Sequence, residues 1–355
     1  MKKLAVTKNT LLTVFYWLYV LILLDVFMRS MLNGYSKESW NITELLINYQ
    51  GGFVRRGLLG EGILYVYRLW GVNPYYLILS VCALAYVLLV AFFVRSFIKR
   101  GYSIFLLPFV FFLGNPIIND FWVRKDVLQV LIFITVLFFS LKKSTWSVLT
   151  TNFFLVVGLL IHEGIGFFCL PIVFLLRLSS TKSSMKGKSN IRLVLYTMLQ
   201  LSPALLVFLF TLYAKGSEAI AQAIWNSWKD IPFQIQDTGN ALIPSAIDAL
   251  SWSLHRGLSY LYNFLRNFNG GFYAPLAWAL ILLAIYYVLS NFNDLNIHVL
   301  KKAPRSNLQK RQFSNVLLFQ LLAVLPLFIL GWDYGRWVFY WVASSFAIVL
   351  LVPES

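Results

Sequence analysis

Two adjacent arginines, Arg55 and Arg56, lie among four glycines in the stretch 51–61. Glycine lets backbone N–H groups approach a ligand closely, and the guanidinium group presents a planar fork that matches phosphate oxygens. We interpret the stretch as a phosphate clamp to which Gly51 and Gly52 contribute as substrate-binding residues. The alternative is an interfacial helix whose arginines reach lipid headgroups.

A second charged segment, 119–126, places two acids and two bases between strongly apolar stretches. Asp126 is expected in the first turn of a helix, where the helix dipole favours a carboxylate. The alternative is a turn in which Asp126 simply neutralises its basic neighbours. The candidates here are Arg124 and Lys125 for binding phosphate, and Asp120 and Trp122 for binding substrate.

A third polar site is the pair His162 and Glu163, which separates two short apolar runs at 146–162 and 164–177. Ionisable residues at membrane depth are functional candidates by default, and irregular backbone is tolerated there where it lines a cavity. We predict that Glu163 is a proton acceptor and that His162 orients or replaces it, with Asp126 as a further candidate. A capping or hydrogen-bonded structural role is the alternative.

The last segment of this kind, 331–337, contains Asp333 and Arg336 flanked by aromatic residues. At a spacing of three, this acid and base could simply pair. It is nevertheless the third such segment in which an arginine accompanies a carboxylate. We therefore predict one site, with a cationic pocket for a diphosphate and a carboxylate base, Asp333 being one more candidate base.

The composition indicates a multi-spanning membrane protein, because 59% of the residues are apolar and only 12% are charged. Neither Cys82 nor Cys169 has a metal-ligand partner nearby in sequence, so no metal site and no cofactor is predicted. The formal net charge of +16 raises the question of nucleic-acid binding, which the distribution of the basic residues answers.

We predict about ten transmembrane helices in a single domain, 1–355, from apolar runs of suitable length. The runs are 10–30, 74–94, 103–118, 127–141, 146–162, 164–177, 193–213, 273–291, 315–331 and 338–352. The even-numbered connections and the N-terminus hold 18 of the 30 basic residues. By the positive-inside rule both termini are cytoplasmic, and the basic excess is a topology signal and not a nucleic-acid footprint.

Two long segments are expected on the outer face, 31–73 with the glycine–arginine motif and 214–272. The second is rich in Trp and Tyr, and its part 245–269 has helical apolar spacing, so we expect short helices at the membrane surface. Aromatic residues suit stacking on sugar rings, although an interfacial aromatic belt predicts the same composition. His255 and Arg256 are the substrate-binding candidates of this loop.

With these residues in view, the chain resembles the Wzy family of bacterial O-antigen and capsular polysaccharide polymerases. The resemblance covers the topology, the enlarged outer loop and the outer arginines, with 51–57 and 124–126 as its local patterns. Some better-known members place their arginines in two large outer loops, each followed at a distance by a glycine. Arg256 with Gly270 or Gly271 is the nearest match to that spacing, whereas the short charged turns depart from it.

The resemblance implies a GT-C-like fold in the bacterial inner membrane, a periplasmic active site and no metal. It further implies undecaprenyl-diphosphate-linked oligosaccharides as donor and acceptor, membrane lipids as surroundings, and a chain-length regulator as a further partner. The leading hypothesis is a polymerase that transfers a glycan from the lipid diphosphate to a sugar hydroxyl on another lipid-linked unit.

Three alternatives stay open. A single-sugar GT-C transferase would use a polyprenyl monophosphate donor, with an acid of the first outer segment, Glu44 or Glu61, as base. A lipid-linked oligosaccharide flippase would need charge along a path across the membrane, and only Asp25 lies in mid-span. A membrane acyltransferase would need a base on a span, and His298 is expected in a solvated cytoplasmic loop.

Overall fold

The computed structural model describes residues 2–185, 187–233, 242–267, 273–291, 307–331 and 333–352, and these residues form helices and no strand. Of the predicted basic connection between 291 and 315, residues 292–306 lie outside the described residues, as do parts of the predicted outer loop, 234–241 and 268–272. The elements are α1 (Lys2–Asn33), α2 (Trp40–Leu46), α3 (Leu58–Trp70), α4 (Pro74–Arg100), η1 (Ile104–Leu106), α5 (Asn115–Ile118), α6 (Lys125–Ser140), α7 (Thr145–Ile161), α8 (Gly164–Ser184), α9 (Asn190–Gln200), α10 (Ser202–Tyr213), α11 (Glu218–Asn226), α12 (Ser245–Asp248), η2 (Ala249–Ser251), α13 (Leu254–Asn267), α14 (Tyr273–Ser290), α15 (Asn307–Leu330) and α16 (Tyr334–Leu351).

Long apolar helices dominate the described part of the chain, which confirms the predicted helical class. Five are long and apolar enough to cross a membrane, or six if α9 and α10, which meet at 68°, form one bent span. Helices α7 and α14 are apolar but shorter. The ten-span count and the GT-C-like architecture therefore stay predictions.

The run 103–118, predicted as a span, does not form a continuous helix. It folds as η1, a series of turns and the four-residue α5. Pro108 interrupts the backbone ladder, and a Cβ at Gly114 would lie 2.0 Å from the Pro108 carbonyl oxygen. The segment packs along α4, where Tyr86 donates a 2.6 Å hydrogen bond to the Leu113 carbonyl.

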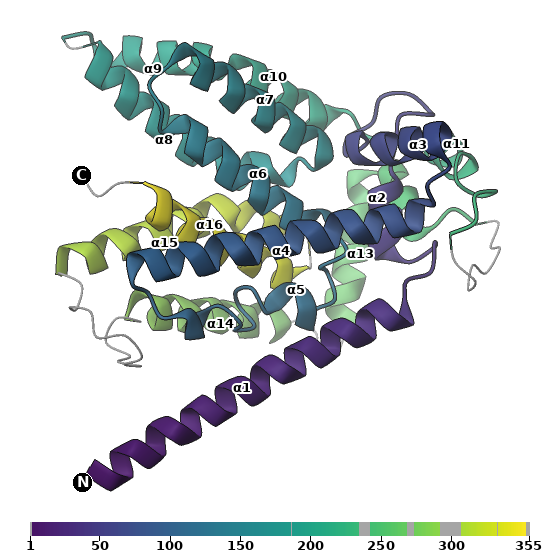
Figure 1. Ribbon diagram of the computed structural model, residues 1–355. Coiled ribbons are helices and arrows are strands. Elements are labelled where there is room, and N and C mark those ends of the chain that lie inside the picture. The colour runs from purple at the N-terminus through teal and green to yellow at the C-terminus, as the bar shows by residue number, and fades with distance from the viewer. Residues whose placement is uncertain are drawn as a thin grey trace.

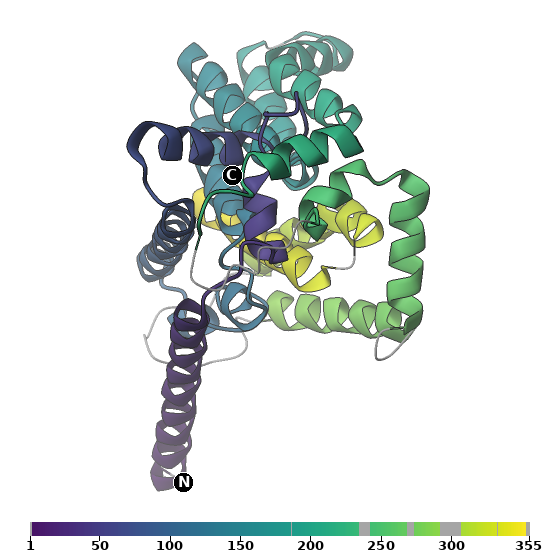
Figure 2. The same cartoon turned by 90° about the vertical axis from the view of Figure 1, so that its right-hand side faces the viewer.

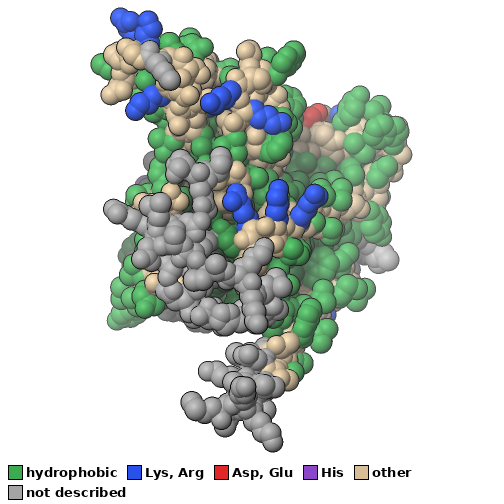
Figure 3. Space-filling model, turned by 60° about the vertical axis from the view of Figure 1, so that its left-hand side comes forward, with side chains coloured by type: hydrophobic (Ala, Val, Ile, Leu, Met, Phe, Trp, Pro, Cys, Tyr) green, Lys and Arg blue, Asp and Glu red, His purple; other side chains and the backbone are tan. Residues whose placement is uncertain are grey.

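The bundle has two chemically different ends. At one end, α6 and α8 begin and α7 ends, beneath an outer layer made of α2, α3 and α11 (Figure 1). At the other end lie the last turns of α4 and the connection between α6 and α7. Figure 3 shows Lys and Arg side chains on that second end among hydrophobic side chains. The basic residues in the last turns of α4 and between α6 and α7 are Arg95, Lys99, Arg100, Lys142 and Lys143.

Two hydrophobic cores hold this arrangement. The larger lies within the bundle, with Phe133 and Phe168 among its fully buried members. The smaller lies under the outer layer and contains Trp122, Trp225 and Trp228. It fixes α2, α3 and α11 onto the bundle, so the segment 31–73 is positioned by packing against the segment 214–272. Helix α1 diverges from the other helices, and its N-terminal end lies apart from them at the bottom of the view (Figure 2).

Candidate functional site

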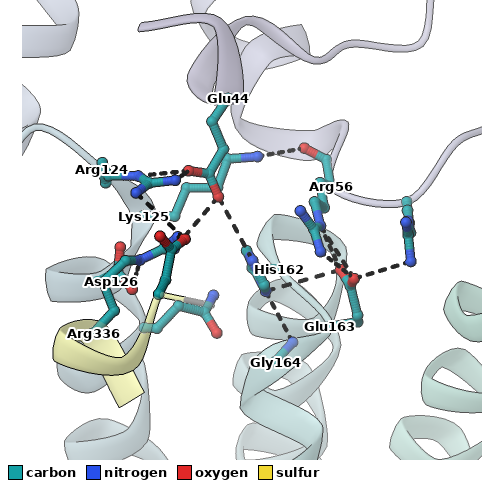
Figure 4. Close-up of polar contacts among 12 residues, drawn as sticks. Glu44, Arg56, Arg124, Lys125, Asp126, His162, Glu163, Gly164 and Arg336 are labelled. Atoms are coloured by element: carbon teal, nitrogen blue, oxygen red, sulfur yellow. Dashed lines mark hydrogen bonds and ion pairs between the residues drawn. The ribbon is translucent and has the colours of Figure 1, made fainter. Parts of the chain in front are cut away.

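Charged side chains from four separate parts of the chain meet at the end of the bundle under the outer layer (Figure 4). They come from α2 and the loop that precedes α3, from the start of α6, from the junction of α7 with α8, and from the start of α16. Nine of the predicted residues are among them. They are Arg55, Arg56, Arg124, Lys125, Asp126, His162, Glu163, Asp333 and Arg336.

Glu163 binds both arginines of the glycine-rich loop. Arg56 donates two hydrogen bonds to this carboxylate in a bidentate ion pair, from Nε to Oε2 at 2.8 Å and from Nη2 to Oε1 at 2.5 Å. Arg55 approaches the same carboxylate, with Nη1 3.3 Å from Oε1. Burial alone raises the pKa of Glu163, but the positive charge of Arg56 and of Arg55 outweighs burial and holds the pKa well below its usual range.

A second group is centred on Glu44, which is 2% exposed. Arg124 holds it through Nε at 2.9 Å and Nη2 at 2.8 Å, and Arg336 lies 3.6 Å away. Arg336 in turn donates to Asp126 at 2.8 Å and to Asp333 at 2.7 Å. Burial raises the pKa of Glu44, and the arginines, Arg124 first, reverse that effect and hold it well below its usual range.

Lys125 connects the two groups. Its buried ammonium donates a 2.9 Å hydrogen bond to the carbonyl oxygen of Arg56. Burial lowers the pKa of Lys125 to about 7. Arg56 has the left-handed backbone conformation, with φ of 69°, which costs a residue with a side chain about 1–3 kcal/mol. Lys125 therefore stabilises a strained backbone that aims the Arg56 side chain at Glu163.

His162 is held as a neutral imidazole between the two groups. Its Nδ1 accepts a 2.9 Å hydrogen bond from the Gly164 N–H, so the proton is on Nε2, which lies 3.6 Å from Glu44. Burial, followed by the charge of Arg56, lowers the pKa of His162 well below its usual value. With its lone pair occupied, His162 fits the predicted orienting role better than the role of base.

The two groups differ in charge balance and in access. Arg55 and Arg56 share one carboxylate and are each 26% exposed at the side chain. Arg124 and Arg336 face three carboxylates and are 8% and 6% exposed. The surplus positive charge is therefore at the loop arginines, and the buried Nε of Arg55 makes no hydrogen bond to a described residue.

The remaining predicted residues lie elsewhere. Gly51 packs against α11, where a Cβ would come within 2.9 Å of Ile220, and Gly52 forms a turn with φ of 109° whose N–H bonds to the Tyr49 carbonyl. Asp120 and Trp122 both bind Ser30 near the end of α1. Arg256 pairs with Asp248 on the outer loop, and its neighbour His255 is exposed.

Glu44 is the residue whose importance the sequence understates, since it is predicted only as the base of the alternative transferase. The available signal is its position as the single acid of α2.

The described residues contain no group of acids, His and Cys that could hold a metal ion. Comparisons with protein-family models, curated proteins and solved structures find no match to this chain.

Proposed function

We propose that this protein is a membrane glycosyltransferase that polymerises lipid-linked repeat units, taking the glycan from a polyprenyl diphosphate at the outer face of the bacterial inner membrane. The single observation that carries the proposal is the Arg55–Arg56 pair, partly exposed and sharing one carboxylate. A diphosphate would supply the negative charge that this pair is short of, and its oxygens match the geometry of two adjacent guanidinium groups. The arginine pair lies at the end of the bundle opposite the basic end, which favours a site at the outer face.

The reaction needs charge stabilisation and a proton acceptor. The acceptor hydroxyl oxygen forms a bond to the anomeric carbon, the bond from that carbon to the phosphate oxygen breaks, and the diphosphate leaves with the electron pair. Arg55 and Arg56 would stabilise the negative charge that develops on the leaving group. Glu163, in contact with both arginines, would accept the hydroxyl proton and release it to water.

The second group would position the first. Arg124 and Arg336 are held by Glu44, Asp126 and Asp333, so they have little charge left for a phosphate. These pairs connect α2, α6 and α16 and so fix the start of α6. Because Lys125 follows Arg124 directly, they also fix the contact from Lys125 to Arg56.

A transferase that moves a single sugar from a polyprenyl monophosphate is a second candidate. The observation in its favour is that Glu44, an acid of the first outer segment, contacts arginine side chains from α16 and from the start of α6. One phosphate needs fewer cations, and in this case Glu44 would be the base. A transporter is less favoured, because the charges of the site gather at one end of the bundle.

The test uses cells that lack the gene and carry Arg55→Ala or Arg56→Ala protein at normal abundance. Removing one preorganised donor reduces the rate by about 10²–10³, so we expect lipid-linked single repeats in place of long ladders. Arg68→Ala is the matched control, because Arg68 lies in the same outer segment and donates to Gln50, away from Glu163. Full ladders from both variants would refute the clamp, and a single-sugar product from wild type would favour the second candidate.

A further inference from the structure

The arginine pair and its carboxylate pose a chemical conflict. Glu163 is the acid best placed to act as base, yet the two arginines keep its pKa well below its usual range, which makes it a poor proton acceptor. The same two guanidinium groups are the ones expected to bind the substrate phosphate. One set of donors cannot fully serve both anions.

The geometry indicates how this conflict is resolved. Three nitrogens contact Glu163, namely Nε and Nη2 of Arg56 and Nη1 of Arg55, and a phosphate bound in a bidentate manner would use the same donors. Buried nitrogens without a hydrogen bond to a described residue occur in both groups, Nε of Arg55 and Nη2 of Arg124 and of Arg336, so they do not distinguish the two. What does distinguish the loop arginines is that the two share one carboxylate and that their side chains are partly exposed. The side chains of both arginines, each 26% exposed, are more exposed than the side chain of Glu163, which is 7% exposed.

We propose that the substrate phosphate takes the Arg55 and Arg56 side chains from Glu163, and that this exchange makes Glu163 a competent base only when the donor is bound. The inference rests on the proposed function and assigns an activation step to the same site. No covalent bond changes in the exchange. The carboxylate stays buried while its neutralising charges are engaged elsewhere, and burial then favours the protonated acid.

The backbone allows such an exchange without a large rearrangement. The Arg56 carbonyl is held by Lys125, and the Arg55 N–H donates a 3.0 Å hydrogen bond to the Ala214 carbonyl. The two side chains can therefore change partners while the loop itself stays fixed. The exchange would also keep an unoccupied site from activating water, because without phosphate both arginines remain paired with Glu163 and leave it a poor proton acceptor.

The test measures binding and proton uptake and needs no turnover. Purified full-length protein is titrated with inorganic pyrophosphate by calorimetry, in buffers of different ionisation enthalpy, from about pH 8 to about pH 5.5. Pyrophosphate titrates in this range and releases protons when it binds arginines, so we expect wild type to take up more protons, or to release fewer, than Glu163→Gln, with a difference that grows as the pH falls. Glu163→Gln removes the competing anion, so it should bind pyrophosphate about tenfold more tightly and lose that part of the uptake.

Asp248→Asn is the matched control, because it releases Arg256, another arginine of the outer face, from its carboxylate. Equal tightening in this variant would show a general charge effect and overturn the exchange. Weaker binding by Glu163→Gln would also overturn it, since Glu163 would then only orient the arginines. Glu163→Ala takes the place of Glu163→Gln if the latter does not fold, and the same difference in proton exchange is then measured. Absence of pyrophosphate binding to wild type would refute the clamp as well.

Discussion

Arg124 pairs with Glu44 and so joins the start of α6 to α2: Nε donates a 2.9 Å hydrogen bond to Oε2, and Nη2 lies 2.8 Å from the same oxygen as an ion-pair contact. Both residues are buried, at 7% and 2% exposure. Such a pair compensates for the desolvation of both charges but adds little beyond that, whereas removing one partner leaves a buried charge unpaired. This relationship fixes where the outer layer sits relative to the bundle.

Arg124→Met is therefore expected to destabilise the protein by about 3–5 kcal/mol, and Glu44→Gln to do so in the same direction. The double variant should be less destabilised than the sum of the two, because it leaves no partner unpaired. Thermal or denaturant unfolding of the four proteins in one detergent measures this coupling. Strictly additive losses would show that the pair makes no energetic contribution as a unit.

Lys125 should make stability depend on pH in a defined window. Burial lowers its pKa to about 7 in the folded protein, against an ordinary lysine pKa of 10.5. Between these values the unfolded chain binds more protons at this site, so its contribution makes the protein more stable as the pH rises from about 7 to about 10.5. Comparing unfolding midpoints of wild type and Lys125→Met across that range isolates the effect, and parallel curves would contradict it.

Two glycines of α3 provide a matched pair for the packing of the glycine–arginine segment. A Cβ at Gly60 would lie 2.1 Å from the Ile47 carbonyl oxygen, whereas a Cβ at Gly62 meets nothing within 4 Å. Gly60→Ala should cost about 1–3 kcal/mol by overpacking. Gly62→Ala should stabilise the helix by about 0.5–1 kcal/mol. Midpoints of thermal unfolding test both, and equal effects would argue against the close approach of α3 to residue 47.

The orientation of the bundle is testable with exposed basic residues at its two ends. Arg68 lies on α3 in the outer layer, and Lys143 lies between α6 and α7 at the opposite end. Both native cysteines are buried, so a cysteine introduced at either site is the accessible one. An impermeant thiol reagent should label Arg68→Cys in intact cells and Lys143→Cys only after the membrane is opened. The reverse pattern would place the charged cluster on the cytoplasmic side.

The amino-acid sequence by itself determines the helical class and the chemical inventory of the site. Long apolar runs can satisfy their backbone groups in a membrane only as helices, and charged residues within such a chain are too costly to be incidental. That reasoning selects Arg55, Arg56, Lys125 and Glu163 from residue type and position alone. It fails for 103–118, because mean hydropathy does not register that Pro108 and Gly114 force the backbone into turns.

Only the tertiary structure decides which charges face each other. The contact between Arg336 and Asp126 joins residues 210 positions apart, and that between Arg56 and Glu163 joins residues 107 apart. Sequence spacing carries no information about such pairs, which depend on how α2, α6 and α16 pack. This packing places three carboxylates around Arg124 and Arg336 and only one beside Arg55 and Arg56. The uncompensated positive charge of the site therefore lies on Arg55 and Arg56.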